Sequence, residues 1–176
     1  VATVTETRII GSVMKIVIAQ LNPVVGDVDG NMDRLETTVA AHAAAAGLVV
    51  FPELYVTGYP PRDLLDRPHF VARAQAAVDR LVAFSRRFPS CGVLCGVPLA
   101  TGRGTGKGLY NAAVLVCGGS IIGIQAKSLL PDYDVFDEAR YFEPARDNNP
   151  IHWGGLRLGV TICEDAWSRD PGSKRR

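Results

Sequence analysis

Hydrophobic positions form two kinds of pattern along the chain: continuous apolar runs, which predict buried strands, and apolar residues at helical spacing, which predict helices. Residues 15–21 (KIVIAQL) and 48–51 (LVVF) are almost continuously apolar, which is typical of strands covered on both faces. Between them, apolar residues recur at helical spacing, with Asn31 or Asp29 available to cap the start and Gly47 to close the end. The pattern therefore predicts a strand, helix, strand unit. The apolar helical positions are Met32, Leu35, Val39, Ala43 and Ala46.

A second helix is predicted over residues 68–87, because apolar side chains again recur at helical spacing and Pro89 prevents continuation. Four further apolar runs are β-like, and the Gly118-Gly119 pair between two of them predicts a hairpin. The chain is therefore predicted to be an α/β protein with a mixed sheet. The β-like runs span residues 91–97, 109–117, 120–126 and 156–162.

The composition of the chain limits which classes of molecule it is expected to bind. Of the 176 residues, 47% are hydrophobic, which is enough for the core of one domain or of part of a larger one. A net charge of +1 does not favour binding to nucleic acid or to an anionic membrane. No stretch approaches the ~20 apolar residues of a membrane span, and Lys15 and Gln20 interrupt the run over residues 9–21 that could resemble a secretory signal. We expect a soluble, cytoplasmic protein that binds a small molecule.

Three other patterns lack the spacing that their chemistry requires. The four cysteines form no C-x-x-C pair and lie far from the histidines, so no metal site is predicted, and the three in apolar runs are interpreted as small buried hydrophobic residues. Residues 101–108 (TGRGTGKG) precede a strand and lack Ser or Thr after the lysine, which favours a hairpin loop over a phosphate-binding loop. The acidic residues within 132–138 lack the order of a calcium loop. The buried cysteines are Cys91, Cys95 and Cys117.

Candidate chemistry lies at the ends of three apolar runs, which Glu53, Lys127 and Cys163 follow. If those strands run parallel, their carboxyl ends meet at one edge of the sheet. A thiol is mostly protonated near neutral pH, so Cys163 would need a base such as Glu53 to become a nucleophile. Lys127 and the backbone N–H of Glu164 could stabilise an oxyanion. Each residue taken singly is explained better as a surface charge or a core thiol than as a catalyst, and the residues alone leave the reaction class open.

Four segments resemble the nitrilase (carbon-nitrogen hydrolase) superfamily, and the resemblance extends over essentially all of residues 14–167. They are KIVIAQLNPVVGDVDGNM, VVFPELYVTGYPPRDLL, KSLLPDYDVFDEARYF and LRLGVTICEDAW. Within the superfamily, GYPPRDLL, LLPDYDVFDEARYF and CEDAW are most similar to the amino-terminal glutaminase domains of glutamine-dependent NAD synthetases. The resemblance implies a nitrilase-type four-layer α-β-β-α sandwich.

The same resemblance implies a role for each matching position. Glu53 would be the general base, Lys127 the oxyanion-stabilising lysine and Cys163 the nucleophile. Glu138 would support the pocket, and Tyr133 would contact glutamine. The implied activity is a glutamine amidohydrolase that releases ammonia for NAD biosynthesis through a glutamyl thioester on the cysteine.

Without the resemblance, the two supporting residues have plainer interpretations. Tyr133 would be a core or rim aromatic residue, and Glu138 a solvated charge. The resemblance implies no cofactor for the amidohydrolase step, since ATP would belong to a following synthetase domain. It also implies that intact members of the family are homo-oligomers.

The chain is expected to be a C-terminally incomplete form of such a domain. Residues 1–13 precede the first methionine and are predicted to be an extension, residues 14–167 a partial glutaminase domain, and residues 168–176 a polar tail. An incomplete sandwich exposes strand edges and admits water to the site, so we expect little activity from the isolated chain. The alternatives are a catalytically incompetent fragment, an interaction module that docks on a complete partner, or another amidase of the superfamily.

Overall fold

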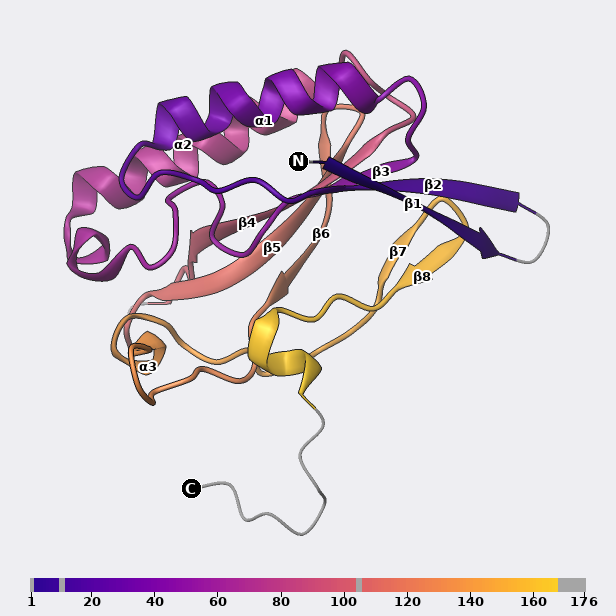
Figure 1. Cartoon of the computed structure of the whole chain (residues 1–176). Helices are drawn as coiled ribbons and strands as arrows, with labels where there is room; N and C mark the ends of the chain where they lie inside the picture. The colour runs from indigo at the N-terminus through magenta and orange to yellow at the C-terminus, as the bar shows by residue number, and fades with distance from the viewer. Residues whose placement is uncertain (1, 10–11, 104–105, 168–176) are drawn as a thin grey trace, which may run out of the picture.

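The computed structural model describes residues 2–9, 12–103 and 106–167, with the backbone alone for residues 2–9 and 12–13. Its main element is a sheet of six strands that lie side by side in the order of the sequence (Figure 1). β2, β3 and β4 are parallel, and the other neighbours are antiparallel, so the predicted mixed sheet is confirmed. The strands are β1 (Ala2–Ile9), β2 (Ser12–Ala19), β3 (Leu48–Val50), β4 (Gly92–Ala100), β5 (Leu109–Cys117) and β6 (Ser120–Ala126).

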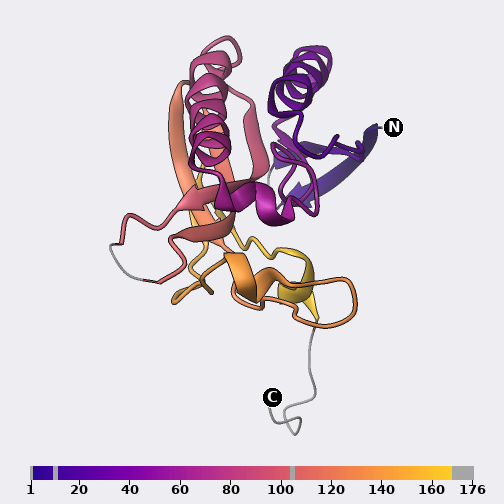
Figure 2. The ribbon, with the colours of Figure 1, turned by 90° about the vertical axis from the view of Figure 1, so that its left-hand side faces the viewer.

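Two long helices, α1 (Val28–His42) and α2 (Pro68–Ser85), lie side by side over one face of this sheet (Figure 2). Their apolar stripes pack on alternate residues of the strands, such as Val17, Val49 and Val93, in one large core cluster. The predicted helical faces are therefore confirmed for the second helix and for Met32, Leu35 and Val39 of the first. Ala43 and Ala46 follow the end of α1 at His42, and α2 ends before Arg87. Among the described residues, no helix combines the length and apolar character that crossing a bilayer would require.

The start of α1 differs from the prediction. Asp27 caps the helix, because its carboxylate accepts a backbone N–H of the first turn at 3.0 Å. Asn31 cannot act as the cap, since its fully buried side-chain amide donates to the carbonyls of Val24 at 2.8 Å and Val56 at 3.1 Å. Asp29 lies inside the first turn. The predicted caps at Asp29 and Asn31 were therefore wrong, and Asn31 instead ties the loop after β3 to α1.

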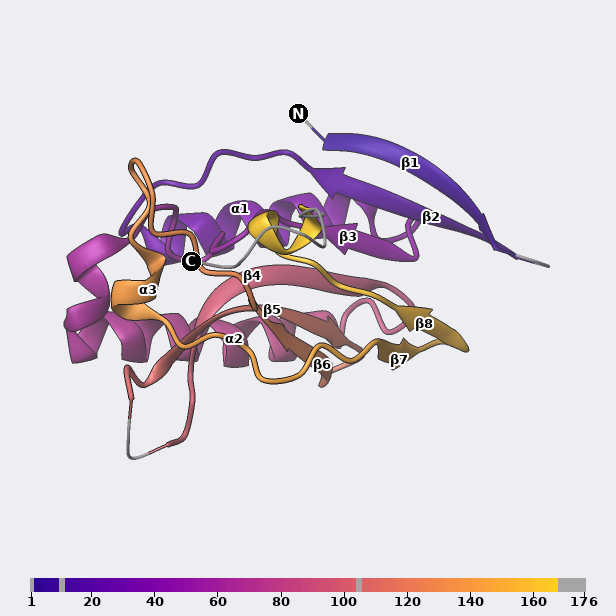
Figure 3. The same cartoon turned by 90° about the horizontal axis from the view of Figure 1, so that it is seen from below.

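A two-stranded ribbon covers part of the opposite face of the sheet (Figure 3). It consists of β7 (Ile151–Trp153) and β8 (Leu156–Leu158), which are antiparallel. Ile151 packs against Gly123 of β6, and Trp153 packs against Gly92 of β4, so closely that a Cβ on either glycine would clash with the ribbon. Both faces of the sheet are therefore apolar, as the continuous hydrophobic runs of the strands predicted.

The predicted strand over residues 156–162 is only partly correct. β8 ends at Leu158, and residues 159–162 have no neighbouring strand within the described part of the chain. Cys163 consequently does not end a strand, but begins the short 3-10 helix η2 (Cys163–Ala166). The remaining elements are η1 (Arg62–Asp66) and the single-turn helix α3 (Glu138–Tyr141).

The division of the chain into an extension, a domain and a tail stays a prediction. The backbone of Ala2–Ile9 forms β1, which pairs with β2 at one edge of the sheet. The predicted polar tail, residues 168–176, lies outside the described residues. Strands β4 and β5 are antiparallel neighbours, in agreement with the hairpin predicted around residues 101–108, of which 104 and 105 lie outside the described residues.

The topology brings two candidate residues to the same edge of the sheet. β4 runs parallel to β3, and the two antiparallel pairings that follow reverse the chain twice, so β6 again runs parallel to β3. Glu53 follows β3, and Lys127 directly follows β6. Their side chains therefore extend from the carboxyl ends of two strands at one edge, as the sequence predicted for this pair.

Candidate active site

Lys127, whose side chain is fully buried, lies between two carboxylates. Its Nζ is 2.7 Å from Oε1 of Glu53 and 2.9 Å from Oε1 of Glu138, and the side chains of these two glutamates are 18% and 5% exposed. Burial alone would lower the pKa of the ammonium group, but the hydrogen bonds and charges of the two glutamates outweigh this effect and raise it. Lys127 therefore carries a fixed positive charge at the centre of the cluster.

The segment that carries Glu53 lies directly on β4. A Cβ on Gly96 would lie 2.3 Å from the backbone nitrogen of Leu54 and 2.5 Å from the carbonyl oxygen of Pro52, so only glycine allows this approach. Leu54 itself has a φ of +47°, a conformation that side chains other than glycine rarely adopt. The backbone beside Glu53 is thus strained and tightly held, as is common where a side chain must be placed accurately.

Two further residues that the sequence did not single out belong to the cluster. Asn111 on β5 donates from Nδ2 to Oε1 of Glu53 at 2.6 Å and to Oε2 of Glu138 at 3.2 Å. The Tyr59 hydroxyl donates to Oε1 of Glu138 at 2.9 Å. Glu138 therefore accepts three hydrogen bonds and is held rigidly, as expected of a supporting group. Asn111 lies inside an apolar strand, where a buried polar residue was the signal that could have identified it.

Cys163 is fixed relative to Lys127 through Asp165. One carboxylate oxygen of Asp165 accepts the backbone N–H groups of Ser128 at 3.0 Å and Leu129 at 2.8 Å, directly after Lys127. The other oxygen accepts the backbone N–H of Ile162 at 3.2 Å. Asp165 thus ties the turn that carries the cysteine to the segment that follows the lysine, and it is a third residue that the sequence interpretation missed.

The Cys163 thiol lies close enough to the charged cluster to interact with it. Burial raises its pKa, the Glu53 and Glu138 charges raise it further, and Lys127 and the Glu164 backbone N–H lower it. The net effect is a raised pKa, so the group is a thiol near neutral pH. Like Leu54, Cys163 has a positive φ, here +46°. A nucleophilic Cys163 would therefore depend on a neighbouring base rather than on spontaneous ionisation.

The raised pKa leads to a direct prediction for alkylation by iodoacetamide, followed by mass spectrometry. Because ionisation of the thiol adds to any reaction that a neighbouring base assists, the rate at Cys163 should rise with pH and reach its midpoint above that of a small free thiol. A Cys163→Ser variant identifies the signal, and Cys91, Cys95 and Cys117 are buried with raised pKa values and should react far more slowly. A midpoint at or below that of the free thiol would contradict the prediction.

Tyr133 and Glu164 meet beside the cluster. The Tyr133 hydroxyl donates to Oε2 of Glu164 at 2.8 Å, and the Glu164 side chain is buried whereas Tyr133 is half exposed. The Tyr133 ring also packs edge-on against Phe136. The structure thus places the Tyr133 hydroxyl on the carboxylate of the residue that directly follows Cys163.

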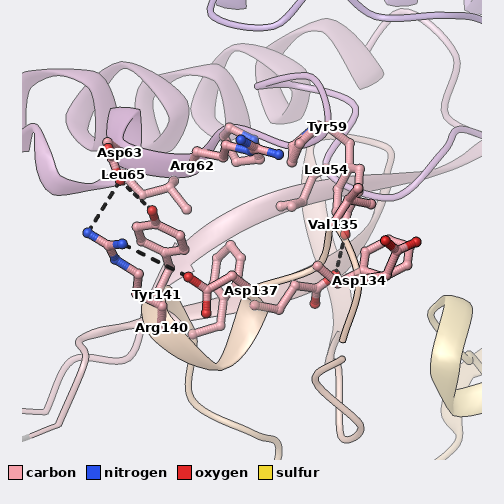
Figure 4. Close-up of a pocket in the computed structure, with 15 residues that line it drawn as sticks. Leu54, Tyr59, Arg62, Asp63, Leu65, Asp134, Val135, Asp137, Arg140 and Tyr141 are labelled. Carbon is pink, nitrogen blue, oxygen red and sulfur yellow. Dashed lines mark hydrogen bonds and ion pairs between the residues drawn. The ribbon is translucent and has the colours of Figure 1, made fainter. Parts of the chain in front are cut away.

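Two cavities lie near these residues. The larger, of about 470 Å³, opens between the segments that contain GYPPRDLL and YDVFDEARYF, and Glu138 lies in its wall (Figure 4). At the rim of this cavity, the Asp63 carboxylate accepts a hydrogen bond from the Tyr141 hydroxyl, and this bond raises the pKa of Tyr141 to about 12. The same carboxylate lies 3.6 Å from the Arg140 guanidinium. The smaller, of about 150 Å³, is lined by both Glu53 and Cys163. We therefore assign the chemistry to the smaller cavity.

The candidate residues thus meet in one place. Glu53, Lys127 and Glu138 are in direct contact, and Cys163 shares a cavity with Glu53. Among the described residues, no three His, Cys, Asp or Glu side chains gather in a way that would hold a metal ion. A buried ammonium, two carboxylates and a thiol can together support nucleophilic attack on a carbonyl group, with proton transfer and oxyanion stabilisation supplied by the side chains.

Comparison with known proteins defines the class. Residues 15–170 match the family model described as carbon-nitrogen hydrolase, and the chain belongs to this family. The curated relatives include the glutamine-dependent NAD(+) synthetases of Aquifex aeolicus and Thermotoga maritima, which are 36% and 37% identical to it over 157 residues. These alignments cover 89% and 88% of this chain but 27% and 26% of the relatives. The chain therefore spans about a quarter of their length.

Solved structures support the same fold. The glutamine-dependent NAD+ synthetase of Acinetobacter baumannii, in complex with adenosine diphosphate, is similar with a TM-score of 0.77 and 35% identity, over 88% of this chain and 28% of that one. An amidase from Nesterenkonia sp. is similar with a TM-score of 0.71 and 24% identity, over 86% of this chain and 56% of that one. The predicted nitrilase-type α/β fold is confirmed, and this chain corresponds to part of each structure.

Proposed function

We propose that this chain carries the glutamine amidohydrolase site of a glutamine-dependent NAD synthetase, with Cys163 as the nucleophile. The observation that carries the proposal is the fully buried Lys127, held between Glu53 and Glu138 beside Cys163. Burying an ammonium group is costly unless carboxylates surround it, so a fixed charge at this position favours a role in chemistry. The relatives named as glutamine-dependent enzymes support a glutamine carboxamide as the substrate.

The first half of the reaction forms a thioester. Glu53 takes the proton of Cys163 as the sulfur attacks the side-chain carbonyl carbon of glutamine. The negative charge on the carbonyl oxygen is stabilised by Lys127 and the Glu164 backbone N–H. Glu53 then returns the proton to the amide nitrogen, the carbon–nitrogen bond breaks, and ammonia leaves.

The second half restores the thiol. A water molecule gives a proton to Glu53 and attacks the thioester carbon, the carbon–sulfur bond breaks, and the proton passes to the sulfur. Glutamate is the product. In this mechanism no cofactor takes part, whereas ATP would serve only the synthetase reaction for which the ammonia is intended. Glu138 supports Lys127, and Tyr133 would contact the part of glutamine remote from the amide.

The proposal can be tested with a glutamine analogue in which a diazoketone replaces the carboxamide. We expect the analogue to label Cys163 alone, and excess L-glutamine to protect it, because labelling requires one chemical step and not sustained turnover. Intact mass spectrometry measures the labelling, ammonia release measures turnover, and Cys163→Ala should abolish both. Equal labelling by an analogue one methylene shorter, without protection by glutamine, would instead favour another amidase of the family.

A further inference from the structure

Asn111 connects the two carboxylates of the cluster without contributing a charge. Its Nδ2 donates one hydrogen to Glu53 at 2.6 Å and one to Glu138 at 3.2 Å. The residue is 1% exposed, and its backbone carbonyl accepts the N–H of Lys127 at 2.8 Å, which places it next to the lysine across the strands. Asn111 and Lys127 therefore bridge the same two glutamates from neighbouring positions.

The side-chain oxygen of Asn111 shows that the two N–H contacts fix the orientation of the amide group. Oδ1 of Asn111 is buried and has no hydrogen-bond partner among the described residues. An unsatisfied buried acceptor is unfavourable, and such groups are uncommon in folded proteins. Rotating the amide by half a turn would instead direct Oδ1 at two carboxylates, which is worse. The two N–H donors are thus retained even though the acceptor is left without a partner.

The bonds also decide which oxygen of Glu53 remains available. Lys127 and Asn111 both donate to Oε1, and the hydrogen bonds within the described part of the chain leave Oε2 without a donor. Glu53 is 18% exposed at its side chain and lines the cavity that contains Cys163. A carboxylate held through one oxygen keeps its orientation while the other oxygen can accept a proton.

We propose that Asn111 is a positioning residue that holds Glu53 by Oε1, so that Oε2 receives the thiol proton of Cys163; this assignment rests on the proposed function of the site. In this step the S–H bond breaks and an O–H bond forms on Glu53. A neutral donor suits the task, because a second cation at this position would stabilise the ionised carboxylate and weaken it as a base.

The test compares Asn111→Leu and Asn111→Asp with the wild-type chain in the alkylation of Cys163 by iodoacetamide. Near neutral pH the reaction needs Glu53 to take the proton, so we expect the rate to fall by about tenfold or more. At high pH, where hydroxide forms the thiolate, the rate should stay within about twofold. A merely structural defect would lower the alkylation rate at both pH values, or would raise it at both by exposing the thiol.

A double-variant comparison tests whether Asn111 acts through Glu53. Glu53→Gln should show the same loss near neutral pH, and adding Asn111→Leu to it should cause no further loss, because the two residues serve one step. Asn148→Leu, at an exposed asparagine, is the matched control and should behave as the wild type. Additive losses, an unchanged profile, or loss of circular dichroism in both Asn111 variants would overturn the proposal.

This experiment does not depend on glutamine hydrolysis. If the wild-type chain fails to react with the glutamine analogue but keeps the difference between neutral and high pH, the proposed substrate is wrong while the role of Asn111 stands. If the analogue labels Cys163 and the Asn111 variants behave as the wild type, the function stands and the positioning role is wrong.

Discussion

Replacing Gly96 with alanine is expected to reduce labelling of Cys163 by the glutamine analogue by roughly a hundredfold, the effect of displacing a catalytic group by about 1 Å. The new Cβ would lie 2.3 Å from the Leu54 backbone nitrogen, too close for any side-chain adjustment to relieve. The segment 52–54 must therefore move away from β4, and Glu53 moves with it. The measurement is the labelling rate at a fixed analogue concentration near neutral pH.

Gly159→Ala is the matched control for this prediction. It makes the same substitution near the site, but nothing lies within 4 Å of the added Cβ, and the residue does not have a positive φ. We expect a labelling rate close to that of the wild type. If Gly96→Ala also labelled at the wild-type rate, accurate placement of Glu53 by β4 would not matter for the reaction.

Replacing Lys127 with methionine should have a large effect on stability as well as on chemistry. The substitution keeps a long apolar side chain but leaves Glu53 and Glu138 facing each other without the buried cation, which should lower the free energy of unfolding by about 3–5 kcal/mol. Labelling by the glutamine analogue should also fall strongly, because the oxyanion loses its fixed positive charge. Urea denaturation followed by circular dichroism measures the first effect.

Two further variants test whether this result is specific to the ion cluster. Lys107→Met alters an exposed lysine and should change the unfolding free energy little. Adding Glu138→Gln to Lys127→Met removes one of the two facing charges, so it should recover part of the lost stability without restoring labelling. A Lys127→Met variant as stable as the wild type would show that the cluster is far more hydrated than its burial indicates.

The sequence predicted the parts of the fold that depend on hydrophobic periodicity. The runs at β2, β3, β5 and β6 and the stripes of α1 and α2 were identified because burial on one or both faces leaves a repeating pattern. The strand predicted over residues 156–162 was too long, because an apolar run does not reveal whether a partner strand is present. The cap at Asp27 was missed, since several polar residues near Asn31 were equally suitable by type.

The residues of the candidate site also divide into those that the sequence predicted and those that it did not. Glu53 and Lys127 could be predicted because polar residues at the ends of apolar strands are conspicuous, and strand direction then places them together. Glu138, by contrast, is a solvated charge on pattern alone, and only the family resemblance indicated its role before the structure showed it buried. Asn111 could have been noticed as a polar residue inside an apolar strand, but its partners could not be predicted. Tyr59 and Asp165 could not be predicted at all, because their contacts depend on loop paths that no local pattern records.

The buried cluster also has a consequence for how the chain folds. Lys127 lies 74 residues from Glu53 and 11 from Glu138 along the sequence, so its pairing requires the sheet to be assembled first. An ammonium group cannot be dehydrated ahead of its carboxylates without a severe penalty. Partly folded chains should therefore keep this lysine in water and the cysteine without its base. The reactive centre, with the lysine between its carboxylates and the base beside the thiol, would therefore form only in the last cooperative step.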